Sequence, residues 1–114
     1  MGRKIDEASK EKVSAKILNP SHLLVASQII NKDPKQKLED YAACSCAIQN
    51  LLLSLAGDGV GSKWSTGKIT TERRTYSIVG INLLEEEIIG FIWIGYGETP
   101  SQVNRPLIKS IFRR

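Results

Sequence analysis

A run of eleven residues from Gly57 to Gly67 holds the residue types best suited to building a binding surface from main chain. Four of the eleven are glycine, and Trp64 stands among them, followed by Ser65 and Thr66. Glycine lacks the Cβ that would otherwise keep a backbone away from a flat or charged ligand. Tryptophan adds a large apolar surface with a single N–H donor. The segment therefore indicates either one wall of a ligand site or an ordinary helix-to-strand loop, and Trp64 either covers a bound ring or fills the core.

The rest of the chain offers no pattern of side chains that indicates acid–base catalysis, a nucleophile or a metal centre. The single histidine, His22, has no paired acid near it in sequence, which favours a structural role. Cys44 and Cys46 are the only cysteines, and at this spacing on a helix they point to different sides and cannot form a relaxed disulfide. We therefore expect no catalytic side chain, no metal, and two buried thiols in a reducing compartment.

The length and the charge favour a small single-domain protein with a small-molecule ligand. The chain has 114 residues and a formal net charge of +4, so one domain over residues 1–114 is the natural expectation. The basic residues are scattered rather than gathered on one element, which favours a solvated surface over a nucleic-acid footprint. The polar N-terminus and the lack of any apolar stretch of ~20 residues predict a cytoplasmic protein without a membrane partner.

One long helix is expected to dominate the fold. The segment Lys37–Ala56 is apolar or small almost all round from Tyr41 onward. A helix of this kind is buried in a core or at a subunit interface. Its first half is rich in side chains no larger than cysteine, which permits the close approach of a second helix.

The two most apolar runs, His22–Ile30 and Ile88–Tyr96, are predicted to be strands buried on both faces. The three glutamates at 85–87 are expected to form an exposed turn. Two strands alone make a marginal sheet in water. We therefore expect either that further strands lie in weaker segments or that another chain supplies them.

Two further helices are expected. One is polar and covers residues 4–16. The other is capped by Thr70 or Thr71 and ends at Gly80, because a threonine hydroxyl caps the first turn and glycine adopts the left-handed conformation that ends a helix.

The order of these segments resembles the FMN-dependent nitroreductase family, in particular its short bacterial members. The resemblance rests on Glu39–Leu53 in the long helix, on Gly59–Gly67 and on Gly90–Gly97. It implies an α+β fold with three α/β/α layers around a mixed sheet. The family's Arg-Arg-Ser motif, which belongs to a segment before these elements, does not occur here. The chain therefore resembles the C-terminal part of the family domain.

The resemblance also implies a cofactor, a reaction and a partner. Trp64, Ser65, Thr66 and Gly67 match the family segment that approaches the isoalloxazine ring of FMN, and Arg105 matches a basic residue placed on the FMN phosphate. Nitroreductases pass reducing equivalents from NAD(P)H to nitro- or quinone-type acceptors, which are small molecules. They are obligate homodimers with two flavin sites at the subunit interface, so the helix over residues 40–56 is expected to form a homodimer.

Two alternatives remain at the level of sequence. The chain could be a catalytically inactive dimerisation or binding module that keeps the interface helix and binds no flavin, or a truncated fragment. The first follows from the missing Arg-Arg-Ser motif, and the second from two buried strands that lack enough neighbours. The inactive module predicts a stable dimer without flavin affinity, whereas the fragment predicts poor solubility, since unpaired apolar strand edges favour association.

Overall fold

The computed structural model describes residues 7–8, 21–97 and 104–107 of the chain. Its elements follow the order β1 (His22–Ile29), α2 (Pro34–Gly57), β2 (Gly61–Ser65), the 3-10 helix η1 (Lys68–Thr70), α3 (Arg73–Val79) and β3 (Glu86–Gly95). The long helix and both predicted strands are therefore confirmed. The predicted helix over residues 4–16 lies outside the described residues, except that 7–8 are helical.

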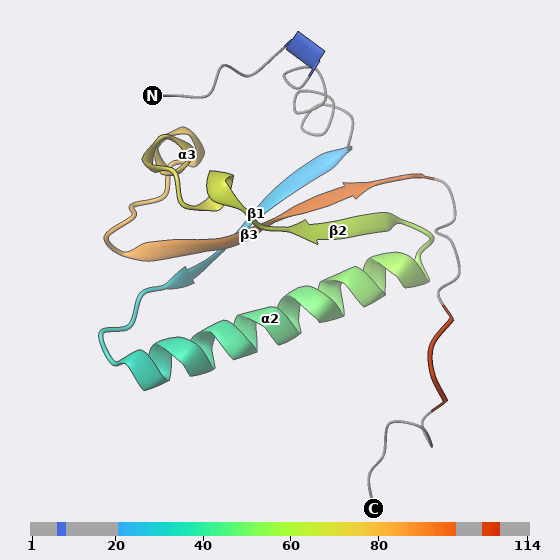
Figure 1. The fold of residues 1–114 in the computed structure, drawn as a ribbon, viewed down its shortest axis with the longest axis horizontal. Coiled ribbons are helices and arrows are strands. Elements are labelled where there is room, and N and C mark those ends of the chain that lie inside the picture. Colours follow the sequence, from blue (N-terminus) through green and yellow to red (C-terminus); the bar gives the residue numbers. More distant parts are fainter. Residues whose placement is uncertain (1–6, 9–20, 98–103, 108–114) are drawn as a thin grey trace, which may run out of the picture.

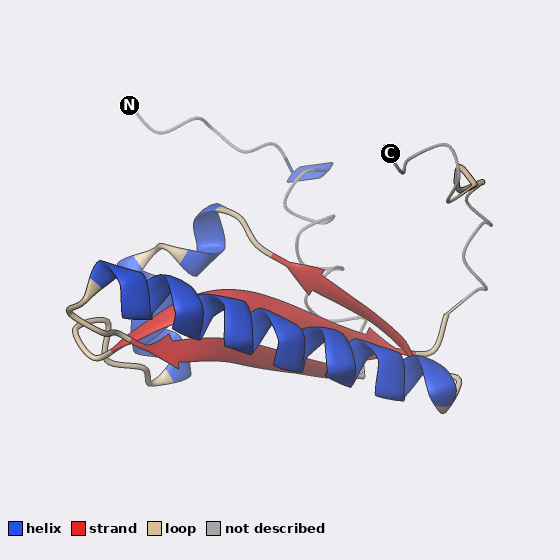
Figure 2. Cartoon of the chain, turned by 90° about the horizontal axis from the view of Figure 1, so that it is seen from below, coloured by secondary structure: helices blue, strands red, loops and turns tan. Residues whose placement is uncertain are grey.

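The described elements form three layers, as the resemblance implied. The strands make one sheet in the order β1-β3-β2, with α2 along one face and α3 on the other (Figure 1). Figure 2, seen from the side of α2, shows this helix running lengthwise in front of the strands. Both strand pairings are antiparallel, so the parallel pairing that a mixed sheet requires is not among these three strands.

The long helix α2 has a clear local cause for its start. Asp33 precedes it in an extended conformation, and its carboxylate accepts a hydrogen bond from Lys35 N at 3.1 Å. Pro34 occupies the first turn, where its missing N–H costs nothing. The helix packs on the sheet through one face, on which Ile48 is buried and Cys44, Leu51 and Leu52 are half-buried.

The core lies on both faces of the central strand β3, whose residues 88–92 are all buried. A bulge determines which of these residues faces which helix. Ala26 pairs with Gly90 and Ser27 pairs with Ile88, so Ile89 has no partner in β1. Ile89 therefore packs toward α2, whereas Phe91, two residues later, packs toward α3. The two resulting clusters of buried residues are Ile48, Ile89 and Ile92 on the α2 face, and Tyr76, Ile88 and Phe91 on the α3 face.

The burial predicted for the first strand is wrong for the described chain. Strand β1 is an edge strand that pairs only with β3. Leu24 is 42% exposed and Ile29 is 76% exposed, because no described element covers them. The apolar run identified a strand correctly but overestimated how many neighbours it has.

The prediction of an exposed turn at residues 85–87 is also wrong for two of its three glutamates. Glu86 and Glu87 begin β3 and are half-buried. Ser27 Oγ donates to Glu86 Oε2 at 2.6 Å, and Gln28 Nε2 donates to Glu87 Oε2 at 3.3 Å. These cross-strand bonds satisfy the carboxylates, which is why two charged residues can extend an apolar strand.

The helix α3 begins later than predicted. Its N-cap is Glu72 rather than a threonine. The hydroxyls of Thr70 and Thr71 instead donate to the carbonyls of Gly67 and Lys68, and so close η1. The predicted end is confirmed, because Gly80 adopts the left-handed conformation with φ 76°.

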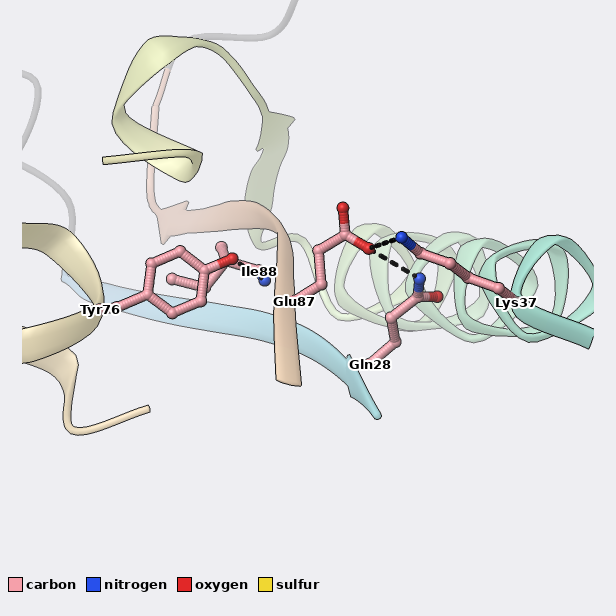
Figure 3. Close-up of polar contacts among 5 residues, drawn as sticks. All are labelled: Gln28, Lys37, Tyr76, Glu87 and Ile88. Atoms are coloured by element: carbon pink, nitrogen blue, oxygen red, sulfur yellow. Dashed lines mark hydrogen bonds and ion pairs between the residues drawn. The ribbon is translucent and has the colours of Figure 1, made fainter. Parts of the chain in front are cut away.

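Replacing Tyr76 with phenylalanine is expected to lower the free energy of unfolding by about 1–2 kcal/mol. The Tyr76 hydroxyl accepts a hydrogen bond from Ile88 N at 2.8 Å, and both residues are buried (Figure 3). The variant leaves that N–H without an acceptor. Urea unfolding measures the loss. Tyr96→Phe is the matched control, because Tyr96 is 83% exposed and should lose almost nothing. Equal losses in both variants would contradict the prediction.

Candidate functional site

The segment Gly57–Gly67 is not one loop. It consists of the last residue of α2, a tight turn, the strand β2 and the first residues after it. In the turn, Val60 N donates back to Leu55 O at 2.9 Å, and Gly59 has φ 75°, which favours glycine. The first half of the predicted wall is therefore a helix end that leads directly into a strand.

The glycine at the start of β2 serves the contact between two strands. Gly61 pairs with Gly95 of β3, and a Cβ on Gly61 would stand 2.9 Å from Gly95 O. Any larger residue would force the two strands apart. This glycine is thus explained without a ligand, and it lies at the opposite end of β2 from Ser65.

Trp64 lies beside the core on the α2 face. Its indole is half-buried against the cluster around Ile92 and covers Gly90, where an added Cβ would overlap the ring. Its Nε1 donates to Ile89 O at 3.2 Å. Ile89 is the unpaired residue of the bulge, so the indole N–H satisfies a carbonyl there. The Trp64 indole therefore packs against the core on the α2 face. It precedes directly the residues 65–67 at the end of β2.

The three residues after Trp64 are the half-buried last residue of β2, Ser65, and two exposed residues, Thr66 and Gly67, held by hydrogen bonds. Ser65 still pairs with Phe91, whereas Thr66 and Gly67 are exposed. The Gly67 carbonyl accepts hydrogen bonds from Thr70 N at 3.0 Å and from Thr70 Oγ1 at 2.7 Å. The hydroxyls of Ser65 and Thr66 make no hydrogen bond to a described residue. Two unengaged hydroxyls thus stand on a fixed turn at the edge of the sheet.

Gly67 adopts a backbone conformation that other residues avoid. Its φ is 134° and its ψ is −167°, a region occupied almost only by glycine. An added Cβ would meet no atom within 4 Å, so the requirement for glycine comes from the backbone alone. The main chain at Gly67 thus has a conformation that requires glycine, and it is exposed, so a ligand can come close to it.

Arg105 is not brought to this turn within one chain. It is exposed and lies in the short described segment 104–107. Figure 1 draws that segment beyond the C-terminal end of α2, well apart from the end of β2. The four residues Trp64–Gly67 lie together because they are consecutive in the chain. Arg105 does not lie beside them.

The outward face of α2 carries small and apolar residues that no described element covers. Ala42, Ala43 and Cys46 are exposed, and Leu53 is 61% exposed. Of the two predicted settings for this helix, burial in the core of a single chain therefore does not hold for its outward face, and burial at a subunit interface stays a prediction; Cys46 is exposed rather than buried. An exposed stripe of this kind is typical of a helix that contacts another chain.

Gly90 and Thr70 support the turn but were not identified from sequence. Gly90 makes room for the Trp64 indole, and Thr70 holds the Gly67 carbonyl. The signal for Gly90 is present in the sequence, because a glycine inside an apolar strand often marks a bulge or a close approach. Thr70 was predicted only as a candidate cap of the following helix, and its sequence position does not reveal that it holds the Gly67 carbonyl.

Within the described ranges, no helix has the length and apolar character needed to cross a membrane. In the same part of the chain, no group of three or more His, Cys, Asp or Glu side chains lies together in a way that could hold a metal ion.

Comparisons with known proteins point to one group. No family model matches the sequence. The chain is 30% identical over 86 residues to the candidate NAD(P)H nitroreductase YfhC of Bacillus subtilis. The aligned residues cover 75% of this chain and 43% of YfhC. Its fold matches a nitroreductase-like protein of Bacillus cereus with a TM-score of 0.80 at 23% identity, over 96% of this chain and 61% of the other.

A second solved structure has a similar fold. It is a candidate nitroreductase from Desulfovibrio desulfuricans in complex with FMN, with a TM-score of 0.57 at 17% identity, over 99% of this chain and 87% of the other. The chain thus spans less than half the length of YfhC and about three-fifths of the Bacillus cereus protein. Its sequence and its α+β fold together relate this chain to the nitroreductase family.

Proposed function

We propose that the chain is part of an FMN-dependent oxidoreductase in which Ser65, Thr66 and Gly67 lie along the edge of the flavin ring. The observation that carries the proposal is the exposed turn after β2, with unengaged hydroxyls on Ser65 and Thr66 and a fixed Gly67. In this proposal NAD(P)H is the reductant and a nitro- or quinone-type molecule is the acceptor. The names of the relatives support that choice.

The turn fits the requirements of a flavin edge. The isoalloxazine ring carries nitrogen and oxygen atoms in its plane that need hydrogen-bond partners, and groups near them tune its electronics. Ser65 and Thr66 offer hydroxyls, and Gly67 lets the ring come close to main chain because it has no Cβ. In this proposal the Trp64 indole does not contact the flavin. It anchors the end of β2 to the core through its packing and its hydrogen bond to Ile89 O.

Bound FMN would supply the hydride chemistry, whereas the chain's own residues bind and orient it. The phosphate is the part of FMN that the turn does not reach. Arg105 could hold it through the paired donors of its guanidinium, but the segment 104–107 that contains Arg105 lies apart from the end of β2 in the same chain (Figure 1). We therefore propose that Arg105 serves a flavin held between two subunits.

The outward face of α2 is the proposed contact between those subunits. Its exposed residues include alanine side chains and Leu53, which would be removed from water when two copies of the helix meet. The resulting homodimer would place two flavin turns in one molecule.

A second function is favoured by a specific observation. Arg105 and the turn do not meet in one chain, and the Trp64 indole is already engaged in the core. A dimerising module without flavin would show the same two features. This alternative keeps the α2 contact and predicts no affinity for FMN.

Titration of the purified chain with FMN tests the proposal. We expect quenching of flavin fluorescence at a stoichiometry of about one FMN per chain, and a dimer by sedimentation. Leu53→Glu is expected to give a monomer that has lost most of its FMN affinity, because a charge at the centre of the contact is desolvated without a partner. Leu84→Glu is the control, since Leu84 is 80% exposed and lies outside α2.

The outcomes separate the two functions. A dimer that leaves flavin fluorescence unchanged would support the flavin-free module. Tight FMN binding by a Leu53→Glu monomer would contradict the two-subunit site while leaving flavin binding intact.

A further inference from the structure

A polar cluster lies where the start of α2 meets the ends of β1 and β3, and the proposed flavin site does not use it. Gln28 Nε2 donates to Glu87 Oε2 at 3.3 Å, and Lys37 Nζ lies 3.3 Å from the same oxygen (Figure 3). These side chains line a cavity of about 360 Å³. Its other walls are Pro34, Leu38 and Tyr41. No residue of the Trp64–Gly67 turn lines it.

The Gln28 carboxamide is incompletely satisfied. Gln28 is 4% exposed, and its Oε1 is buried without a hydrogen-bond partner. Figure 3 shows this oxygen on the side of the carboxamide that faces Lys37 and α2, from which most of the cavity walls come. A buried acceptor without a donor costs free energy that a suitable ligand would recover. Because Gln28 lines the cavity, this oxygen is an acceptor in its lining that lacks a donor.

The charges around the cavity restrict which group can fill that place. Lys37 and Glu87 stand side by side, so an anionic ligand would be repelled by Glu87 and a cationic ligand by Lys37. A primary carboxamide is neutral and carries two N–H donors and one acceptor oxygen. The donors complement Gln28 Oε1 and the Glu87 carboxylate, and the oxygen complements the Lys37 ammonium.

The remaining walls favour an aromatic ring next to that group. Pro34, Leu38 and Tyr41 add apolar surface to the lining of the cavity. A volume of about 360 Å³ is at the small end of ligand sites, which suits one ring rather than a dinucleotide. We propose that this cavity binds a small aromatic primary carboxamide.

Benzamide is the probe, and amide-resolved NMR of the full chain is the measurement. We expect benzamide to produce saturable shifts at Gln28, Lys37 and Tyr41, including the side-chain NH2 of Gln28. Acetophenone has the same ring and carbonyl but no N–H donor, so it is expected to bind about tenfold more weakly. The experiment contains no flavin, so its result is independent of the proposed function.

Two variants and a control locate the site. Gln28→Met removes the buried acceptor and should weaken benzamide about tenfold, and Lys37→Met removes one donor and should weaken it about fivefold. The Lys37 side chain is half-exposed, so Lys37→Met is expected to fold. It therefore keeps the test valid if Gln28→Met does not fold. Lys35→Met, on the same helix but outside the cavity, should bind like the unmodified chain. Equal affinities for benzamide and acetophenone, or no localised shifts up to the solubility limit of benzamide, would overturn the proposal.

Discussion

Replacing Gly90 with alanine is expected to lower the free energy of unfolding by about 3 kcal/mol, at the upper end of overpacking effects. An added Cβ at Gly90 overlaps the Trp64 indole and lies 3.1 Å from Ser65 O, so the edge strand β2 must move away from β3. For a chain of this size the loss corresponds to a fall in Tm of roughly 12 °C. Thermal unfolding followed by circular dichroism measures it.

Two further variants show that the overlap with the indole is the cause. Gly57→Ala adds the same methyl group at the end of α2, where a Cβ meets nothing within 4 Å, and should keep the original Tm. Trp64→Leu removes the ring that Gly90→Ala would strike. The double variant should therefore lose clearly less stability than the sum of its two single variants. Additive losses would mean that overlap with the indole is not what makes alanine at position 90 destabilising.

Replacing Gly67 with alanine is expected to weaken FMN binding about tenfold. The backbone at Gly67 has φ 134° and ψ −167°, and a residue with a Cβ there costs about 1–3 kcal/mol. The turn should relax to another conformation and carry Thr66 out of register with the flavin edge. Fluorescence titration with FMN measures the affinity, and thermal unfolding reports the accompanying loss of stability.

The control for this prediction is Gly97→Ala. Gly97 is exposed, has no positive φ and has open space around its Cβ position. This variant should bind FMN as the unmodified chain does. If both alanine variants bind equally well, the conformation of Gly67 has no part in the site.

The strong elements were predictable because local signals and tertiary structure agree there. The run from Lys37 to Ala56 is long and rich in helix-forming apolar residues, and it forms most of α2. The runs that became β1 and β3 are dominated by apolar and β-branched residues. Gly80 ends α3 in the left-handed conformation for the reason that its residue type predicts.

The weaker elements were not predictable because their causes are non-local. Strand β2 has the sequence Gly-Ser-Lys-Trp-Ser, which carries little strand propensity, and it forms because β3 supplies a partner. Glu86 extends β3 because Ser27, fifty-nine residues earlier in the sequence, donates to its carboxylate. The bulge at Ile89 decides which face each later residue of β3 takes, and no short window of sequence reveals it.

The candidate site was predictable as a segment but not as a geometry. The composition of Gly57–Gly67 indicated a special backbone, and Gly67 does adopt one. The roles within it differ, because Gly61 serves strand pairing and the Trp64 indole faces the bulge. Of the four residues predicted to line the cofactor, Thr66 and Gly67 are exposed, whereas Trp64 and Ser65 are half-buried.

The most direct test of the account is an NMR map of the residues whose amide signals move when FMN is added to the dimeric chain. We expect the largest shifts on Ser65, Thr66 and Gly67, with little change at Gln28 and Lys37. FMN binding that leaves the signals of residues 65–67 in place would contradict it.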